Sequence, residues 1–143
     1  MSPEANKAVA RRLFQAMTRG DLDAVDLLFA PDAVVHDPGR ELRGTPAIRQ
    51  GLQALRAAFP DIVYTVEAQL AEGDLVASRY RGTGTHLSDW RGVPASGRRF
   101  SYTGILIHPF EGGKIAEFWG QADLLGLLRQ LGMVQLPGPP LLL

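Results

Sequence analysis

The hydrophobic residues of this chain change their spacing near residue 60, and this change constrains the fold more than any other feature. Before it, apolar residues recur at helical spacing, as in Val9, Leu13 and Met17. After it, β-branched and aromatic residues alternate with polar ones, which is typical of strands. A leucine-rich segment, 124–131, then returns to helical spacing. Helices followed by clustered strands predict an α+β fold, with N-terminal helices packed on one face of a mainly antiparallel sheet.

Capping and breaking residues indicate where these elements begin and end. Ser2 and Pro3 can start the first helix, and Gly20 can end it. Pro31 ends the second helix, and Pro60 stops the third. The expected helices span residues 3–19, 21–30, 45–59 and 123–132; a short extended piece lies within 31–44, two strands within 62–86, and single strands at 100–110 and 114–122.

Composition and charge exclude several classes of protein. Fifteen Lys and Arg balance fifteen Asp and Glu. The chain therefore lacks the excess of basic residues that would indicate a nucleic-acid partner. Cysteine is absent, which excludes disulfides and thiol nucleophiles. Because no signal-like segment or membrane-length apolar run occurs, we expect a soluble, cytoplasmic protein without membrane contact. We expect one domain over residues 1–136 and an irregular tail over 137–143.

Asp123 stands where the last strand gives way to the last helix, and two interpretations remain open. As a helix N-cap, its carboxylate would accept a hydrogen bond from a backbone amide, which lowers its pKa. If strand alternation instead holds from Ile115 to Asp123, the carboxyl group shares a face with Trp119 and Gln121. Burial on that face would raise its pKa, so that it could exchange a proton with a ligand.

The histidines and tyrosines give weaker indications. A lone histidine at a strand end most often makes a surface hydrogen bond. No two histidines have the spacing of paired metal ligands, so we expect no metal site. A tyrosine hydroxyl could donate to a carbonyl oxygen of a ligand, although each tyrosine fits a strand equally well as packing. These residues are His36, His86, His108, Tyr64, Tyr80 and Tyr102.

Several segments together resemble the SnoaL-like polyketide cyclase family: "FAPDAVVHDPG", "WRGVPASGRRFSY" and "EFWGQADLLGLLRQLG". The resemblance covers nearly the whole chain to about Gly132. It implies the nuclear-transport-factor-2-like cone, in which a strongly curved mixed sheet and helices enclose a pocket. It also implies closure of a polyketide ring by intramolecular aldol condensation, without metal or cofactor. In that family's pattern, the proton-transfer residue matches Asp123 and a histidine at a strand end matches His86.

The resemblance further implies a small hydrophobic or aromatic substrate, such as a polyketide, and a homodimer. Two positions depart from the family pattern: Ser88 replaces a glycine after His86, and Gly104 occupies a strand position that can be polar. Alongside catalytic Asp123 and His86, the residues expected to contact the substrate are His36, Trp119, Tyr102, Tyr80, Gln121 and Trp90.

Other functions of the same fold stay open at the level of sequence. Epoxide hydrolysis would need an arginine between two acids, and Arg79 or Arg81 could pair with Asp123, but no Asp follows either arginine at the required spacing. Steroid isomerisation would need a second inward-facing acid. A non-catalytic module that binds a small molecule would need only the pocket.

Overall fold

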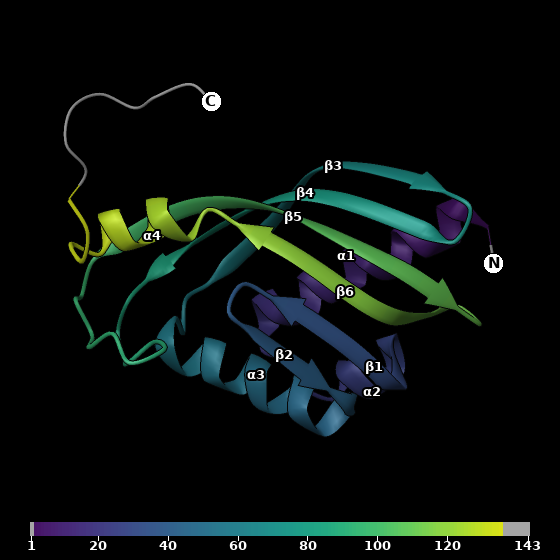
Figure 1. Ribbon diagram of the computed structural model, residues 1–143, viewed down its shortest axis with the longest axis horizontal. Helices are drawn as coiled ribbons and strands as arrows, with labels where there is room; N and C mark the ends of the chain where they lie inside the picture. Colours follow the sequence, from purple (N-terminus) through teal and green to yellow (C-terminus); the bar gives the residue numbers. More distant parts are fainter. Residues whose placement is uncertain (1, 136–143) are drawn as a thin grey trace.

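The computed structural model describes residues 2–135 and contains four helices and six strands in that range (Figure 1). Helices and strands follow the expected order, except that two strands, β1 and β2, precede α3 where one short extended piece was predicted. Their bounds are α1 Pro3–Arg19, α2 Ala24–Leu28, β1 Phe29–Asp37, β2 Arg40–Arg43, α3 Gly44–Ala58, β3 Val63–Glu72, β4 Leu75–Thr85, β5 Arg99–Glu111, β6 Lys114–Ala122 and α4 Leu124–Gln130.

The six strands form one mixed sheet in the order β2-β1-β6-β5-β4-β3. Neighbouring strands are antiparallel except β1 and β6, which run parallel. This pairing brings residues 34–36 of β1 beside residues 117–119 of β6, although the two segments are far apart in the sequence (Figure 1). The carboxyl ends of these two strands therefore meet at the same edge of the sheet.

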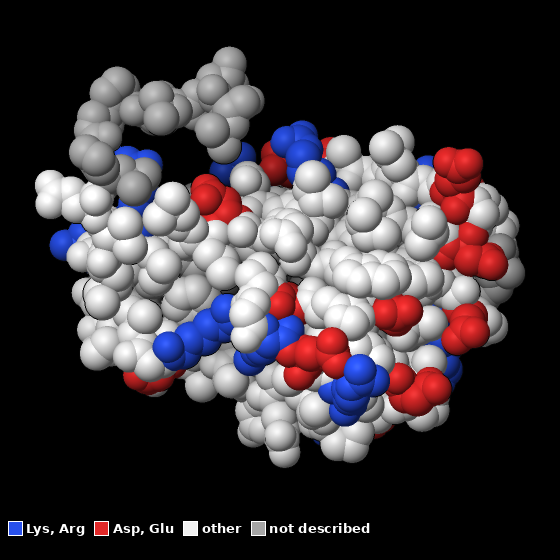
Figure 2. Space-filling view, in the orientation of Figure 1, with Lys and Arg blue, Asp and Glu red and all other residues white. Residues whose placement is uncertain are grey.

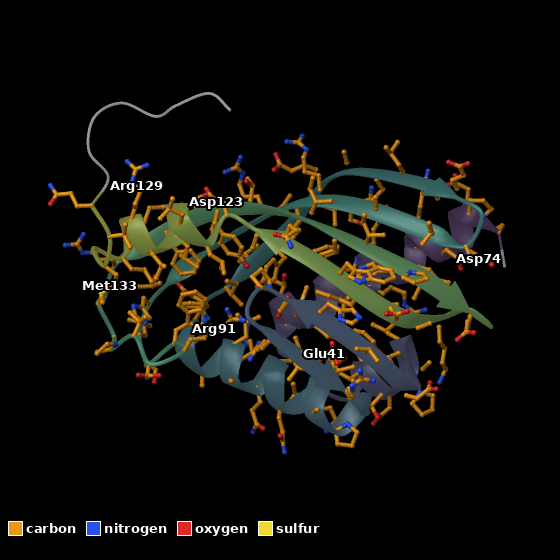
Figure 3. The ribbon with its side chains drawn as sticks, viewed as in Figure 1. Glu41, Asp74, Arg91, Asp123, Arg129 and Met133 are labelled. Atoms are coloured by element: carbon orange, nitrogen blue, oxygen red, sulfur yellow. The ribbon has the colours of Figure 1, made fainter. Side chains whose placement is uncertain are left out.

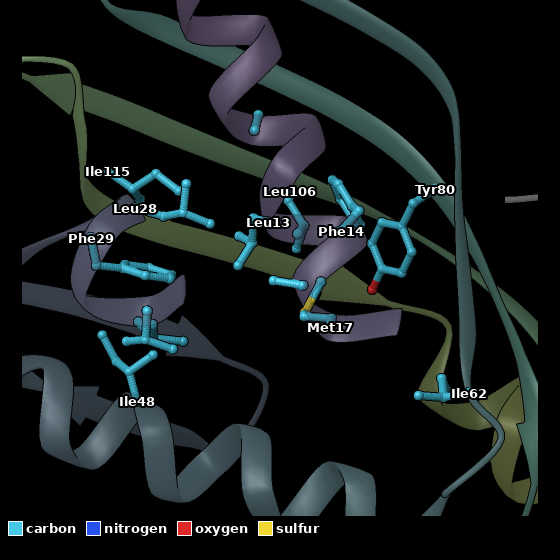
Figure 4. Close-up of a cluster of buried hydrophobic side chains, with 14 of the residues drawn as sticks. Leu13, Phe14, Met17, Leu28, Phe29, Ile48, Ile62, Tyr80, Leu106 and Ile115 are labelled. Carbon is cyan, nitrogen blue, oxygen red and sulfur yellow. The ribbon is translucent and has the colours of Figure 1, made fainter. Parts of the chain in front are cut away.

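Helices cover one face of the sheet, and the hydrophobic core lies between this face and the helices (Figure 4). Leu13, Phe14 and Met17 of α1 are buried against Tyr80 and other inward-facing strand residues. Ile48 of α3 is buried in the same core. The apolar stripes of both helices thus meet the inner face of the curved sheet, as their spacing predicts.

The first helix begins and ends at the residues predicted from its capping signals. Ser2 accepts a hydrogen bond from the amide of Ala5, and Gly20 ends the helix with a φ of 70°. The second helix is shorter than predicted, because Phe29 already belongs to β1. Strand β1 tolerates Pro31 since its pairing with β6 is interrupted between Phe29 and Val34.

A bulge in β6 interrupts the side-chain alternation predicted for that strand, so the prediction is wrong beyond the bulge. Ile115 pairs with Phe110 and is buried, whereas Trp119 pairs with Ile107 and is 43% exposed. Between these pairs, β6 has one residue more than β5. An extra residue reverses which side chains face inward, so Ile115 and Trp119 lie on opposite faces although four positions separate them.

No helix within residues 2–135 is long and apolar enough to cross a membrane. The cytoplasmic location stays a prediction. The predicted irregular tail, 137–143, lies outside the described residues.

Candidate functional site

A cavity opens between the helix-covered face of the sheet and helices α1 and α3. Its walls are mostly apolar, with Leu13 and Met17 from α1 and Leu52 and Leu55 from α3. A mainly apolar cavity with a few converging polar groups is typical of a small-molecule site. Its ionisable lining residues are Asp37, Arg40, Tyr64, Tyr80, Arg91 and Tyr102.

Asp37, at the end of β1, supplies the only carboxylate to this cavity among the described residues. Its side chain is 28% exposed, and its Oδ2 lies 3.7 Å from a guanidinium nitrogen of Arg40. A Cβ atom at Gly120 of the neighbouring strand would lie 3.0 Å from Oδ1 of Asp37. The missing side chain at Gly120 therefore leaves the space in which the carboxyl group sits.

Three tyrosines on β3, β4 and β5 surround the interior of the cavity. The hydroxyl oxygens of Tyr64 and Tyr102 are 3.1 Å apart, and the rings of Tyr80 and Tyr102 stand perpendicular. Burial raises the pKa of all three phenols, and the negative charge of Asp37 adds to each rise. They consequently stay protonated at neutral pH and can donate hydrogen bonds to a ligand.

The loop between β4 and β5 brings Trp90 and Arg91 into the same lining. Trp90 packs on Phe59, with ring centroids 5.7 Å apart. Of the side chains predicted to contact the substrate, Trp90, Tyr80 and Tyr102 therefore line the cavity. Their contact with a substrate stays a prediction.

Asp123 does not lie in the cavity, and the expectation that it is buried is wrong. Its side chain is exposed and accepts a hydrogen bond of 2.9 Å from the amide of Gly126, at the start of α4. Figure 3 shows it at the surface, on the side away from α3. The bulge in β6 is the reason, because it turns the odd-numbered residues from Trp119 onward to the outer face.

His86 is fully buried but is not part of the lining. Its Nδ1 accepts a hydrogen bond of 3.1 Å from the amide of Ser96, across the loop that carries Trp90. Its ring lies edge-on to Phe59, which does line the cavity. His86 therefore has no contact with the cavity, its hydrogen bond to Ser96 fastens this loop, and its catalytic role stays a prediction.

The remaining predicted contact residues lie on the outer face of the sheet. His36 is stacked on Trp119 at 5.6 Å and lies between Glu41 and Glu117, at 3.2 and 2.9 Å. Gln121 is exposed beside them. The expectation that His36, Trp119 and Gln121 face a pocket is therefore wrong. The bulge in β6 explains Trp119 and Gln121. His36 faces outward because it alternates on β1 with Val35 and Asp37, which line the cavity.

Two alternatives from the sequence can be compared with this geometry. Arg79 and Arg81, considered for epoxide hydrolysis, are exposed on strand β4 and lie outside the cavity. No group of three or more His, Asp or Glu side chains within residues 2–135 is placed to hold a metal ion.

Sequence reasoning did not select Asp37, Arg40 or Arg91. The alternation of Ala33, Val35 and Asp37 already places this carboxyl group on the apolar face of its strand. The two arginines carry no comparable signal, because a turn and a loop bring them together.

The sequence model of the SnoaL-like polyketide cyclase family matches residues 7–131. Aklanonic acid methyl ester cyclase DauD of Streptomyces sp. (strain C5) is 33% identical over 92% of this chain and 83% of its own length. Cyclase DnrD of Streptomyces peucetius, which acts on the same ester by its name, is 33% identical over 87% and 88%. The solved structure of TsrD from Streptomyces laurentii has 30% identity and a TM-score of 0.86, covering 94% of this chain and 99% of TsrD.

Proposed function

Because this chain belongs to the SnoaL-like polyketide cyclase family, we propose that it closes a ring of an aromatic polyketide by intramolecular aldol condensation, with Asp37 as general acid and base. One observation carries the assignment: Asp37 is the carboxylate that the described residues place inside the cavity. This role replaces the one predicted for Asp123, which is exposed.

The proposed reaction begins with removal of a proton. A carbon between two carbonyl groups is acidic enough for a nearby carboxylate to take its proton, and the C–H electron pair becomes an enolate. General base catalysis by a positioned side chain contributes about 10²- to 10⁴-fold to the rate. Apolar walls from α1 and α3 limit the water that would compete for the same proton.

Carbon–carbon bond formation follows. The enolate carbon attacks a ketone elsewhere in the same molecule, and the ketone oxygen becomes an alkoxide. Protonated Asp37 then returns its proton to that oxygen, so the product is an isomer of the substrate and the carboxylate is regenerated. The reaction needs no cofactor, because no electrons or atoms leave the substrate.

The phenols of Tyr64, Tyr80 and Tyr102 suit the stabilisation of enolate and alkoxide oxygens. They are neutral donors on rigid strands and already face the cavity. A single donor of this kind is worth about 10²- to 10³-fold in other enzymes. The cavity also holds both reacting ends of one molecule together, which can lower the barrier by several kcal/mol, on the order of 7.

The test compares wild type with Asp37→Asn, supplied with aklanonic acid methyl ester and with the corresponding free acid. Ring closure is followed by chromatography and NMR, since substrate and product have equal mass. We expect wild type to close the ring of at least one of these two compounds, and Asp37→Asn to do so about 10²- to 10⁴-fold more slowly with similar affinity. Wild-type turnover by Asp37→Asn would contradict the assignment, and tight binding without any turnover would favour a binding module.

We also propose a homodimer that forms through the outer face of the sheet. Ile105, Ile107 and Trp119 lie on adjacent strands there and are 49%, 39% and 43% exposed. Exposed apolar side chains gathered on one face are typical of an interaction surface. Sedimentation velocity should give a dimer for wild type and a monomer for Ile105→Lys, and a monomeric wild type would contradict the proposal.

A further inference from the structure

Two arginines, Arg40 and Arg91, line the same cavity as Asp37. Arg40 begins β2, directly after the turn that follows Asp37, and Arg91 lies in the loop between β4 and β5. Figure 3 shows Arg91 near α3, and Figure 2 shows positive and negative side chains next to one another at the same place. The two arginines are the only cationic side chains that the described residues contribute to the lining.

Arg91 is held in a defined position. One of its guanidinium nitrogens donates a hydrogen bond of 3.0 Å to the backbone oxygen of Pro38, and the guanidinium lies 5.6 Å from the centre of the Trp90 ring. Its backbone has a φ of 52°, and it is the only non-glycine residue with positive φ between residues 2 and 135. Such a conformation costs free energy and persists where surrounding contacts over-determine it.

The charges at the mouth do not cancel. Asp37 lies near Arg40, at 3.7 Å, while no described carboxylate lies within ion-pair distance of Arg91. Burial lowers the pKa of Arg91, nearby Arg40 lowers it further, and Asp37 opposes both. Two cations thus share one internal anion. A second anion between them would relieve their repulsion and could accept hydrogen bonds from both guanidinium groups.

We propose that Arg40 and Arg91 form a subsite for an ionised carboxylate, so that the substrate is an aromatic polyketide acid rather than its neutral ester. The polyketide part rests on the proposed function, whereas the carboxylate subsite rests on the two arginines alone. Both side chains are exposed to solvent at the mouth, so a ligand can reach them without passing through the protein. The apolar interior would receive the rings, and the mouth would hold the acid group.

Binding of an unreactive pair of probes tests this subsite without any catalysis. Anthracene-2-carboxylate and its methyl ester have the same rings and differ in charge, and their intrinsic fluorescence reports Kd. We expect wild type to bind the acid at least about tenfold more tightly than the ester at low salt, since hydrogen bonds to charged groups are strong. The preference should shrink as NaCl screens the charges.

Variants identify the residues responsible. Arg91→Gln and Arg40→Gln should each weaken acid binding by about tenfold and leave ester binding unchanged. Arg129→Gln is the control, because Arg129 is exposed on α4 and outside the cavity. If Arg91→Gln melts early, Arg91→Lys keeps the charge and should give an intermediate preference, because lysine lacks the planar fork.

Several results would overturn the subsite: equal affinity of wild type for acid and ester, no binding of either probe, or an unchanged preference in both glutamine variants. Failure of the proposed function is a separate result. Asp37→Asn removes a competing carboxylate, so it should bind the acid at least as tightly as wild type while ring closure slows by about 10²- to 10⁴-fold. An Asp37→Asn variant that closes rings normally but keeps the acid preference would refute the catalytic role and leave the subsite standing.

Discussion

The inner and outer faces of the same sheet carry similar residue types, but the inner face buries them and the outer face exposes them to solvent. On the inner face, Asp37 lies in the cavity beside protonated phenols, and His108 is completely buried. On the outer face, Asp123 caps a helix in solvent and His36 lies between two glutamates. The chemistry available to a residue is therefore set by the face on which its strand position places it. A one-residue bulge in β6 decides that face for the last strand.

The largest expected difference between the faces is in the free energy of unfolding that is lost when a leucine side chain is truncated. Leu106 is 3% exposed on the inner face and Leu70 is 76% exposed on β3. We expect Leu106→Ala to lower the free energy of unfolding by about 2–5 kcal/mol, since it leaves a cavity. Leu70→Ala should lower it by less than about 1 kcal/mol. Urea unfolding measures both, and equal losses would break the distinction between the faces.

Low pH should lower the free energy of unfolding, because protonation of His108 is unfavourable where it is buried on the inner face. Burial lowers the pKa of His108 to about 4, with the backbone of Glu117 partly opposing this shift. The unfolded chain therefore binds the proton first, and stability is lost as pH falls from about 6.5 towards 4. The loss attributable to this group is about 3 kcal/mol. In His108→Leu, the fall in unfolding free energy over this range should be smaller by that amount, and identical pH slopes would contradict the burial argument.

Two glycines offer a matched comparison of the two aspartates. A Cβ atom at Gly120 would press on Oδ1 of Asp37, and one at Gly126 would press on the carboxyl group of Asp123. Gly120→Ala should slow ring closure by about tenfold to a hundredfold, because a shift of about 1 Å misplaces the proton carrier. Gly126→Ala should leave the rate of ring closure within about twofold of wild type. A larger loss of turnover in Gly126→Ala would reverse the assignment.

The smallest expected effect is that of the exposed cap. Asp123→Ala should lower the free energy of unfolding by about 1 kcal/mol, because the amide of Gly126 loses its acceptor. Thermal melting followed by circular dichroism measures this loss, with Asp123→Ser as a control that restores a capping oxygen. Stability equal to wild type in Asp123→Ala would show that the cap does not stabilise α4.

Much of the fold could be predicted from local signals. Helix α1 begins and ends where Ser2 and Gly20 predicted, and the last hairpin turns at Gly112–Gly113, between the strands expected at 100–110 and 114–122. These features depend on residues that are neighbours in sequence. The strand β1 was underestimated, because its pairing with β6 joins residues about 80 positions apart.

The site could be predicted only in part for the same physical reason. Tyr80 and Tyr102 lie on regular stretches of strand, so simple alternation predicts that Tyr80 shares a face with Val76 and Tyr102 with Phe100. Asp123 follows a bulge, and a bulge depends on how β6 pairs with β5. The space for Asp37 depends on Gly120 in a different strand, which no local pattern of β1 reveals.

Deuterium exchange at the carbon acid tests the central claim most directly, because it isolates proton removal from ring closure. The substrate is a polyketide analogue whose accepting ketone has been reduced, dissolved in D₂O, with NMR reporting loss of the C–H signal between the two carbonyls. We predict rapid enzyme-dependent exchange for wild type and Asp123→Asn, and only the uncatalysed rate for Asp37→Asn. Exchange at the wild-type rate in Asp37→Asn, or its loss in Asp123→Asn, would contradict the account.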